Sequence, residues 1–191
     1  MKLTPEWVGT SADADIPIPP NVRRYYIPGT THGGLNVPAP NTQFNASLAG
    51  SLLPPPACPG NNFGTGLLNA NPLPHLHTVN ALRLHFRNWV MKGVEPPPNR
   101  YPTIAAKTLV NASKEAIGFP SLPGLPASVP TVVPPKIKRI IPMLAPKVDA
   151  DGNELGGVPL VLNDAPLGTY LGWNITAGGG EQCVGAVKTV N

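Results

Sequence analysis

The sequence predicts an α/β fold, and three observations support that prediction. First, 41% of the 191 residues are hydrophobic and only 13% are charged, a balance typical of folded domains and not of disordered chains. Second, a strand pattern at residues 21–29 is followed by a long helical pattern at residues 74–92. Third, the 27 prolines and 20 glycines, roughly a quarter of the chain, predict that loops and short strands make up much of the rest.

Residues 21–29, "NVRRYYIPG", are predicted to form an edge strand of a mainly parallel sheet. They combine β-branched and aromatic residues, with Pro19 and Pro20 before them and Pro28-Gly29 after them. We assign residues 1–34 to this strand and the histidine loop that follows. Residues 35–73 are rich in Asn, Pro, Gly and Ser and are predicted to be one long irregular loop, the kind that is usually functional or wrapped on its domain.

A long amphipathic helix is predicted at residues 74–92. Its apolar residues recur at the spacing of one helical face: Leu76, Val79, Leu82, Phe86, Trp89 and Val90. Lys92 in the last turn, Gly93 after it and the "EPPP" that follows predict where the helix stops. We expect this face to pack on the sheet, so Trp89→Ala should remove a core side chain, which destabilises by about 3–5 kcal/mol.

Residues 93–191 are predicted to be a Pro-rich region of short strands and loops, including strands at "VPLVL" and "LGTYLGWNI". Its "DADGN" segment, Asp149 to Asn153, begins like an EF-hand calcium loop. The pattern then fails, because Glu154 stands where that loop needs glycine and Leu160 where it needs a bidentate glutamate. We therefore predict a tight polar turn and no calcium site.

Composition also argues against several partners. The formal charge of +4 is scattered, and the densest basic cluster alternates with isoleucines, so we expect no nucleic-acid partner. No stretch approaches the ~18 apolar residues of a membrane span, so we expect no membrane partner. Cys58 and Cys183 lie far apart without metal-ligand spacing, and a disulfide and two buried thiols remain open alternatives.

The remaining motifs give no complete active site. His75, His77 and His85 lie on or near the predicted helix without a second pair of ligands and are interpreted as helix-surface residues. Ser47 and Ser51 lack the flanking glycines of a nucleophile elbow. Walker-type and dinucleotide-type glycine motifs are absent as well.

His32 is the one residue in a setting that suggests catalysis. It stands in "GTTHGG", directly after the predicted strand. A histidine on a small-residue turn at a strand end is how serine hydrolases with an α/β fold present their general base, and in those enzymes the histidine comes last along the chain. The alternative interpretation, a polar residue in a turn, is more common for a single histidine in a glycine-rich loop.

Three blocks of sequence resemble one known family. They are "NVRRYYIPGTTHGG", "ALRLHFRNWVMKGVEPPPNRYPTIAAKTLV" and "PKVDADGNELGGVPLVLNDAPLGTYLGWNI". In this order and spacing they resemble the C-terminal half of a group of bacterial and fungal α/β-hydrolase domain proteins. The resemblance spans most of the chain, and it implies a partial α/β-hydrolase sheet.

The resemblance also implies roles for particular residues. His32 corresponds to the triad base, and Glu6 in "TPEWVG" is the closest match to the acid, with Asp13 and Asp15 as rivals. The serine and the oxyanion-hole donors belong to an N-terminal half of the same domain, which this sequence does not contain. The implied function is hydrolysis of a small-molecule ester without cofactor or metal. The resemblance allows a periplasmic or secreted location, and the sequence itself specifies none. A non-catalytic binding or structural module is the alternative function.

Overall fold

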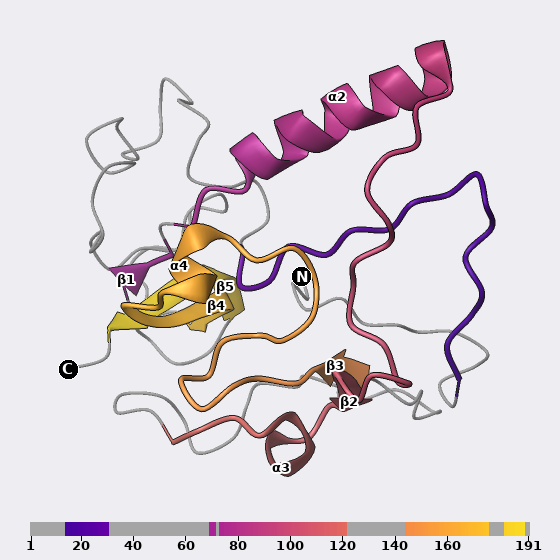
Figure 1. Ribbon diagram of the computed structural model, residues 1–191. Helices are drawn as coiled ribbons and strands as arrows, with labels where there is room; N and C mark the ends of the chain where they lie inside the picture. The colour runs from indigo at the N-terminus through magenta and orange to yellow at the C-terminus, as the bar shows by residue number, and fades with distance from the viewer. Residues whose placement is uncertain (1–13, 31–68, 72, 122–143, 176–181, 190–191) are drawn as a thin grey trace.

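The computed structural model describes residues 14–30, 69–71, 73–121, 144–175 and 182–189. The ribbon in Figure 1 shows two small sheets lying apart from each other and a long helix, α2, extending away from both. Besides α2, the described residues form a three-stranded sheet, a two-stranded sheet and two single-turn helices, α3 (Lys114–Ile117) and α4 (Val161–Asp164).

The three-stranded sheet has the order β1-β5-β4 and is antiparallel throughout. It consists of β1 (Asn69–Ala70), β4 (Gly168–Ile175) and β5 (Gln182–Thr189). Strand β4 confirms the predicted strand at "LGTYLGWNI". The predicted long loop lies mostly outside the described residues, but its last residues include β1.

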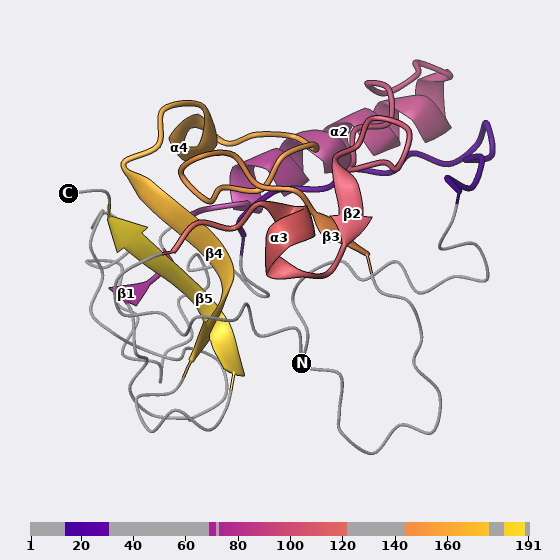
Figure 2. The ribbon, with the colours of Figure 1, turned by 90° about the horizontal axis from the view of Figure 1, so that it is seen from below.

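The two-stranded sheet joins β2 (Leu109–Asn111) to β3 (Leu144–Pro146), again antiparallel. Figure 2 shows this pair beside α3 and apart from the β4–β5 pair. Helix α3 was not predicted; it begins because the Ser113 hydroxyl accepts a hydrogen bond of 3.1 Å from the Ala116 amide, which satisfies a donor left free at a helix start. Ile117 on its inner side is buried with Ala145 and Val148 in a small core.

Two parts of the predicted architecture are wrong. The segment expected to be a parallel edge strand forms only one parallel bridge, between Tyr25 and Arg100. "VPLVL" was expected to be a strand, but its last two residues open α4. β-Branched and aromatic residues favour an extended backbone, but a strand also needs a neighbouring segment that pairs with it along its length. Residues 21–29 pair with their neighbour only at Tyr25.

Helix α2 (Leu76–Lys92) confirms the predicted helix and its end. Gly93 adopts a left-handed conformation with φ of 67°, and its amide caps the carbonyls of Asn88 and Trp89. The predicted burial is wrong, because none of the helix residues is buried. Phe86 is 63% exposed and Val90 is 65% exposed, while Trp89 is half-buried beneath the Arg23 guanidinium, 4.6 Å from the ring centroid.

This placement changes the expected result for Trp89→Ala. A half-buried ring stacked on one arginine contributes about 1–2 kcal/mol, since an exposed cation–π contact gives about 0.5–1 and partial burial adds a similar amount. We therefore expect the free energy of unfolding, measured with urea, to fall by about 1–2 kcal/mol and not by the 3–5 kcal/mol of a core position. Leu84→Ala, at a 56% exposed position of the same helix, is the control and should change it by under about 0.5 kcal/mol.

Candidate functional site

The Pro28–Gly29 turn is the best-anchored part of the N-terminal segment. Both residues are buried. Gly29 has a φ of 64°, in the left-handed region that only glycine adopts at little cost. A side chain there would also place its Cβ 2.8 Å from the Tyr170 carbonyl oxygen. Glycine is therefore required both by the backbone conformation and by the close approach of β4.

Glu154 holds this turn from a distant part of the sequence. Its Oε2 atom accepts a hydrogen bond of 2.8 Å from the Gly29 amide and another, short one from the Tyr26 hydroxyl. The Tyr26 carbonyl in turn accepts 2.7 Å from the Val158 amide. Together these contacts tie both ends of the Tyr26–Gly29 segment to residues 154–158.

Asn71 fixes the other side of the same turn. It is 1% exposed, and its side-chain amide donates to the Gly29 carbonyl at 2.5 Å and to the Leu171 carbonyl in β4 at 2.9 Å. Its Oδ1 accepts from the Leu73 amide at 2.9 Å. Because a buried polar side chain is tolerated when its hydrogen bonds are made, these three bonds explain why an asparagine lies in the core.

Burial is the main cause of the raised pKa values of both Tyr26 and Glu154. It raises the pKa of Glu154 above the ordinary 4.5, although the hydrogen bonds from Tyr26 and Gly29 act in the opposite direction. Burial also raises the pKa of Tyr26 well above its ordinary value of 10.0, and the nearby Glu154 charge and hydrogen bond raise it further. Tyr26 therefore remains a hydrogen-bond donor across the physiological pH range.

The raised pKa of Glu154 gives a testable pH dependence. A carboxyl whose pKa is higher in the folded than in the unfolded state stabilises the fold fully below its unfolded value, near 4.5, and loses that contribution as the pH rises through the folded value. We expect the free energy of unfolding of the wild type, relative to Glu154→Gln, to decrease as pH rises above 4.5. Urea titrations of both proteins between about pH 4 and 8 measure this; parallel curves would contradict it.

The predicted "DADGN" turn is confirmed and leads into Glu154. Asp149 Oδ1 accepts from the amides of Asp151 and Asn153, each at 2.9 Å. Asn153 is buried, and its side chain pairs with the backbone of β4, donating to the Gly168 carbonyl at 3.1 Å and accepting from the Tyr170 amide at 2.8 Å. These hydrogen bonds hold the turn against β4. The next residue, Glu154, is thereby positioned to accept the hydrogen bond from the Gly29 amide.

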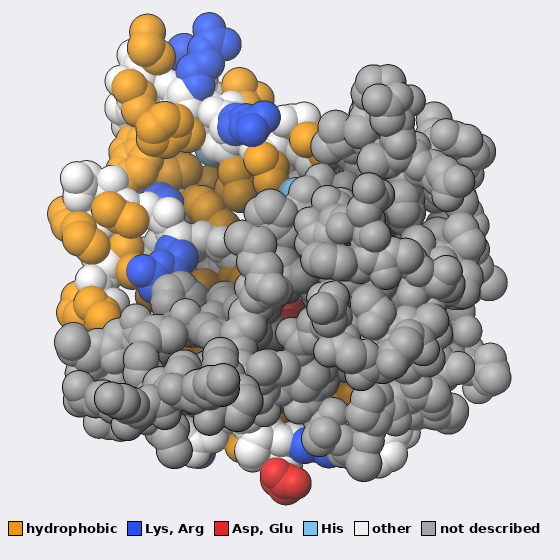
Figure 3. Space-filling view, turned by 180° about the vertical axis from the view of Figure 1, so that it is seen from behind, with side chains coloured by type: hydrophobic (Ala, Val, Ile, Leu, Met, Phe, Trp, Pro, Cys, Tyr) orange, Lys and Arg blue, Asp and Glu red, His pale blue; other side chains and the backbone are white. Residues whose placement is uncertain are grey.

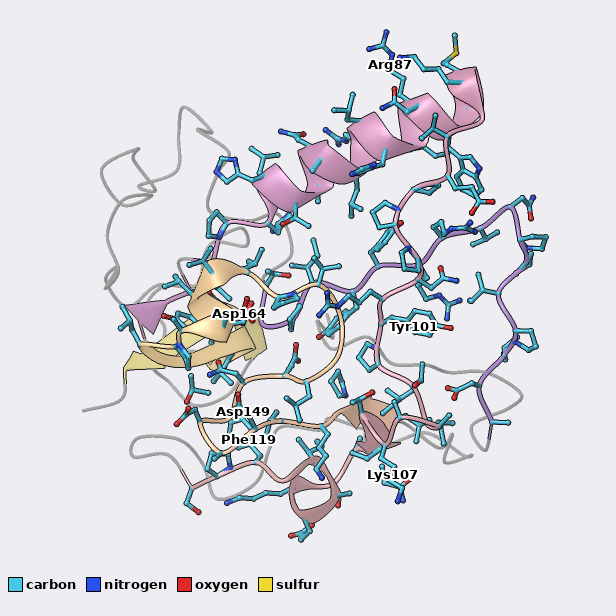
Figure 4. The ribbon with its side chains drawn as sticks, in the orientation of Figure 1. Arg87, Tyr101, Lys107, Phe119, Asp149 and Asp164 are labelled. Atoms are coloured by element: carbon cyan, nitrogen blue, oxygen red, sulfur yellow. The ribbon has the colours of Figure 1, made fainter. Side chains whose placement is uncertain are left out.

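An open cleft of about 520 Å³ lies beside this anchor. Its wall consists of Pro28, the segment 99–108 and the segment 149–164. In Figure 4, Tyr101 lies on the segment that runs down from α2, and Asp149 and Asp164 lie on the opposite, orange segment. With Arg100 also in its lining, the cleft offers both hydrogen-bond donors and acceptors to a polar ligand.

Of the four candidate catalytic residues, the structure describes only Asp15. His32, Glu6 and Asp13 lie outside the described residues, as do Cys58 and the side chain of Cys183. Asp15 is exposed, and its two carboxylate oxygens accept the backbone amides of Ile104 and Ala105, each at 2.9 Å. His77 and His85 are exposed on α2, as predicted.

Sequence reasoning missed Glu154, Tyr26 and Asn71. Glu154 entered it only as the residue that spoils a calcium-loop pattern. The one feature of the local sequence that draws attention to Glu154 is its position directly after the "DADGN" turn. That turn resembles the start of a calcium-binding loop, but Glu154 stands where such a loop needs glycine. Among the described residues, no group of three or more His, Cys, Asp or Glu side chains is arranged to hold a metal ion, and no helix is long and apolar enough to cross a membrane.

Comparison with known proteins gives one match. A family model described as an alpha/beta hydrolase domain matches residues 1–190, which is nearly the whole chain. Neither the curated proteins nor the solved structures contain a match.

Proposed function

Because the chain belongs to the alpha/beta hydrolase domain family, we propose that it is the histidine-bearing part of a serine hydrolase that cleaves ester-type acyl bonds in small molecules. The observation that supports this proposal is the anchored Pro28–Gly29 turn, which immediately precedes "TTHGG" and is held by Glu154 and Asn71. A general base must come within about 2.6–3.2 Å of the proton that it removes. A chain segment fixed just before the histidine serves that requirement.

In the proposed reaction His32 is the general base and then the general acid. It takes the proton from the serine hydroxyl as the oxygen attacks the acyl carbon, and it returns the proton to the leaving alcohol. A carboxylate holds the imidazole in the required tautomer. Glu6 is our first candidate for it and Asp13 the second; Asp15 ranks below them, because both of its oxygens accept backbone amides.

The nucleophile is proposed to come from a preceding part of the same domain. Two serines lie among the described residues, and both are engaged in local structure: Ser113 caps α3, and Ser121 accepts from the Lys114 ammonium at 3.1 Å. Neither stands between glycines in an elbow of the G-x-S-x-G type, which exposes a nucleophile at the end of a strand. In this proposal, the preceding part supplies both the serine and the oxyanion hole.

A serine-directed fluorophosphonate probe tests this proposal. We expect the protein that includes the preceding part to be labelled at one serine outside residues 1–191, and we expect the 191-residue chain alone to remain unlabelled and without esterase turnover. Labelling should disappear when that serine is replaced by alanine. Esterase turnover by the chain alone that depends on His32 would contradict the proposed division of the active site.

The second candidate function is a non-catalytic binding module, which the open polar cleft favours. The same experiment separates the two. A binding module would resist the phosphonate probe in every form of the protein, whereas a small polar ligand would still protect the cleft residues, such as Tyr101, from chemical modification.

A further inference from the structure

The open cleft of about 520 Å³ has side-chain hydrogen-bond donors on two of its walls that lack acceptors among the described residues. On the 99–108 wall, the exposed Arg100 guanidinium makes no hydrogen bond or ion pair to the described part of the chain. On the 149–164 wall, Asn163 accepts from the Leu160 amide at 2.9 Å through Oδ1, while its amide nitrogen is buried and has no partner there. Because a buried donor without an acceptor destabilises a fold, an oxygen-bearing ligand in the cleft would satisfy a need that the described residues leave open.

Two backbone donors belong to the same lining. The amides of Gly156 and Gly157 donate to no acceptor among the described residues. Together with Arg100 and Asn163 they make the cleft rich in donors, so a ligand there must offer several acceptor oxygens.

The carboxyl groups of the lining decide the charge of that ligand. Asp164 is exposed, and its carboxylate accepts nothing from the described residues. Asp149 uses Oδ1 for two amides of its own turn, and Glu154 is the third carboxyl group in the lining. Figure 4 shows Asp149 and Asp164 on the segment that lies across from Tyr101. Against these groups Arg100 is the one cation among the lining residues, so an anion such as phosphate would meet net repulsion.

A neutral ligand with several hydroxyl groups satisfies both sets of groups. Each hydroxyl donates one hydrogen bond and accepts up to two, so it pairs with a carboxylate and with a guanidinium or an amide. A purely cationic amine would leave the donors without acceptors. The rings of Pro28, Pro159 and Tyr101 in the lining add apolar surface for the C–H groups of such a ligand.

The size and the location of the cleft agree with this ligand class. Small-molecule sites usually measure roughly 300–1,000 Å³, and the cleft lies within that range. The surface near α2 has a different character, because Figure 3 shows mostly hydrophobic and basic side chains there. Within the described ranges, the cleft is therefore the place where unpaired donors and acceptors face a common space.

We propose that this cleft is a binding site for a neutral polyhydroxylated ligand of the sugar class, with Arg100 and Asn163 donating to its oxygens and Asp164 accepting from its hydroxyls. None of these side chains belongs to the proposed triad, so the inference does not depend on the hydrolase proposal. It gives a ligand class to the binding module that is the second candidate function. Its test uses no serine probe, and the two proposals therefore fail independently.

Titration of the isotopically labelled 191-residue chain, followed by proton–nitrogen correlation spectra, tests the site. The probes are D-glucose, D-galactose, D-mannose and myo-inositol. We expect at least one of them to shift the side-chain amide of Asn163 and the backbone amides of Gly156 and Gly157. The Kd should be on the order of 1 mM, because an open cleft with few contacts binds weakly. The Gly93 amide at the end of α2 is the control signal and should not move.

Two results of the titration would overturn the proposal. One is that none of the four probes shifts the cleft signals at concentrations up to about 50 mM, well above the expected Kd. The other is that sodium phosphate or glycine shifts them and the four neutral probes do not, which would identify an anion site or a zwitterion site.

Substitutions in the lining test which groups hold the ligand. Asn163→Asp keeps an oxygen for the Leu160 amide and removes the donor nitrogen, and Arg100→Gln removes the cation at an exposed position. Each should weaken binding at least about tenfold. Lys107→Gln removes an exposed cation from the same segment but outside the lining, and binding should stay within about twofold of the wild type.

The Arg100 variant keeps the test decisive if Asn163→Asp disturbs α4, because the Arg100 side chain has no structural contact within the described part of the chain. Wild-type affinity of Arg100→Gln would overturn the proposal. An equal loss in Lys107→Gln would also overturn it, since the effect would then come from the overall charge and not from a contact in the cleft.

Discussion

Replacing His32 by alanine in the protein that includes the preceding part is expected to reduce esterase turnover by about 10³-fold or more. Without the base, no group removes the serine proton during attack or protonates the leaving alcohol, and the remaining rate comes from the oxyanion hole and substrate binding. Steady-state kinetics with a chromogenic ester measures the change. The loss should fall on kcat, because the histidine contributes little to ground-state binding.

Two controls make this result specific. The unfolding midpoint of His32→Ala should match the wild type, since the sequence predicts a turn position with few packing contacts, and substitutions at such positions change stability by under about 0.5 kcal/mol. His77→Ala removes an exposed histidine from α2 and should leave turnover unchanged. Near wild-type turnover of His32→Ala would show that the histidine is a turn residue and would end the serine hydrolase proposal.

Gly29→Ala is expected to lower the free energy of unfolding by about 3 kcal/mol, the largest stability effect that we predict. A left-handed conformation disfavours any L-residue by about 1–2 kcal/mol, and overpacking adds about 1–3 kcal/mol. The overpacking is unavoidable here, because the new Cβ would lie 2.8 Å from a backbone oxygen, that of Tyr170. Urea unfolding followed by circular dichroism measures the change.

Gly93→Ala provides the matched control for that prediction. Gly93 has a φ of 67°, close to the 64° of Gly29, but a Cβ there would meet nothing within 4 Å. It should therefore show only the conformational part, about 1–2 kcal/mol. If the two substitutions lowered the free energy of unfolding equally, β4 would have to move away from the new methyl group at position 29 at no cost. That result would contradict a rigidly held turn.

Local features of the fold could be predicted because their causes are local. The spacing of apolar residues defined α2 to within two residues of its start, and Lys92-Gly93 defined its end. The short apolar segment "LGTYLGWNI" predicted β4, and the Asp and Gly residues of "DADGN" predicted a turn. In each case the chemistry that decides the structure lies within a few residues of the element.

The candidate site could not be predicted in the same way, because its contacts join distant residues. Glu154 and Gly29 are 125 positions apart, and neither carries a local sign of the other. The strand prediction at 21–29 was wrong for a related reason, since side-chain preference does not reveal whether a neighbouring segment pairs along the strand. "VPLVL" was wrong because short apolar runs fit a strand or a helix, and Asn163, which accepts from the Leu160 amide at 2.9 Å, favours the helix here.

The bonds that anchor Gly29 also determine when the turn can form during folding. The chain must close a loop of 125 residues for Glu154 to reach the Gly29 amide, and chain statistics put the length-dependent part of that closure near ~4 kcal/mol. Contacts of such long range form slowly. During synthesis, residues 14–30 leave the ribosome long before Glu154 and β4 exist, so the segment that precedes His32 takes its final shape among the last events. A partly synthesised chain would therefore carry His32 before the contacts that anchor the preceding turn have formed.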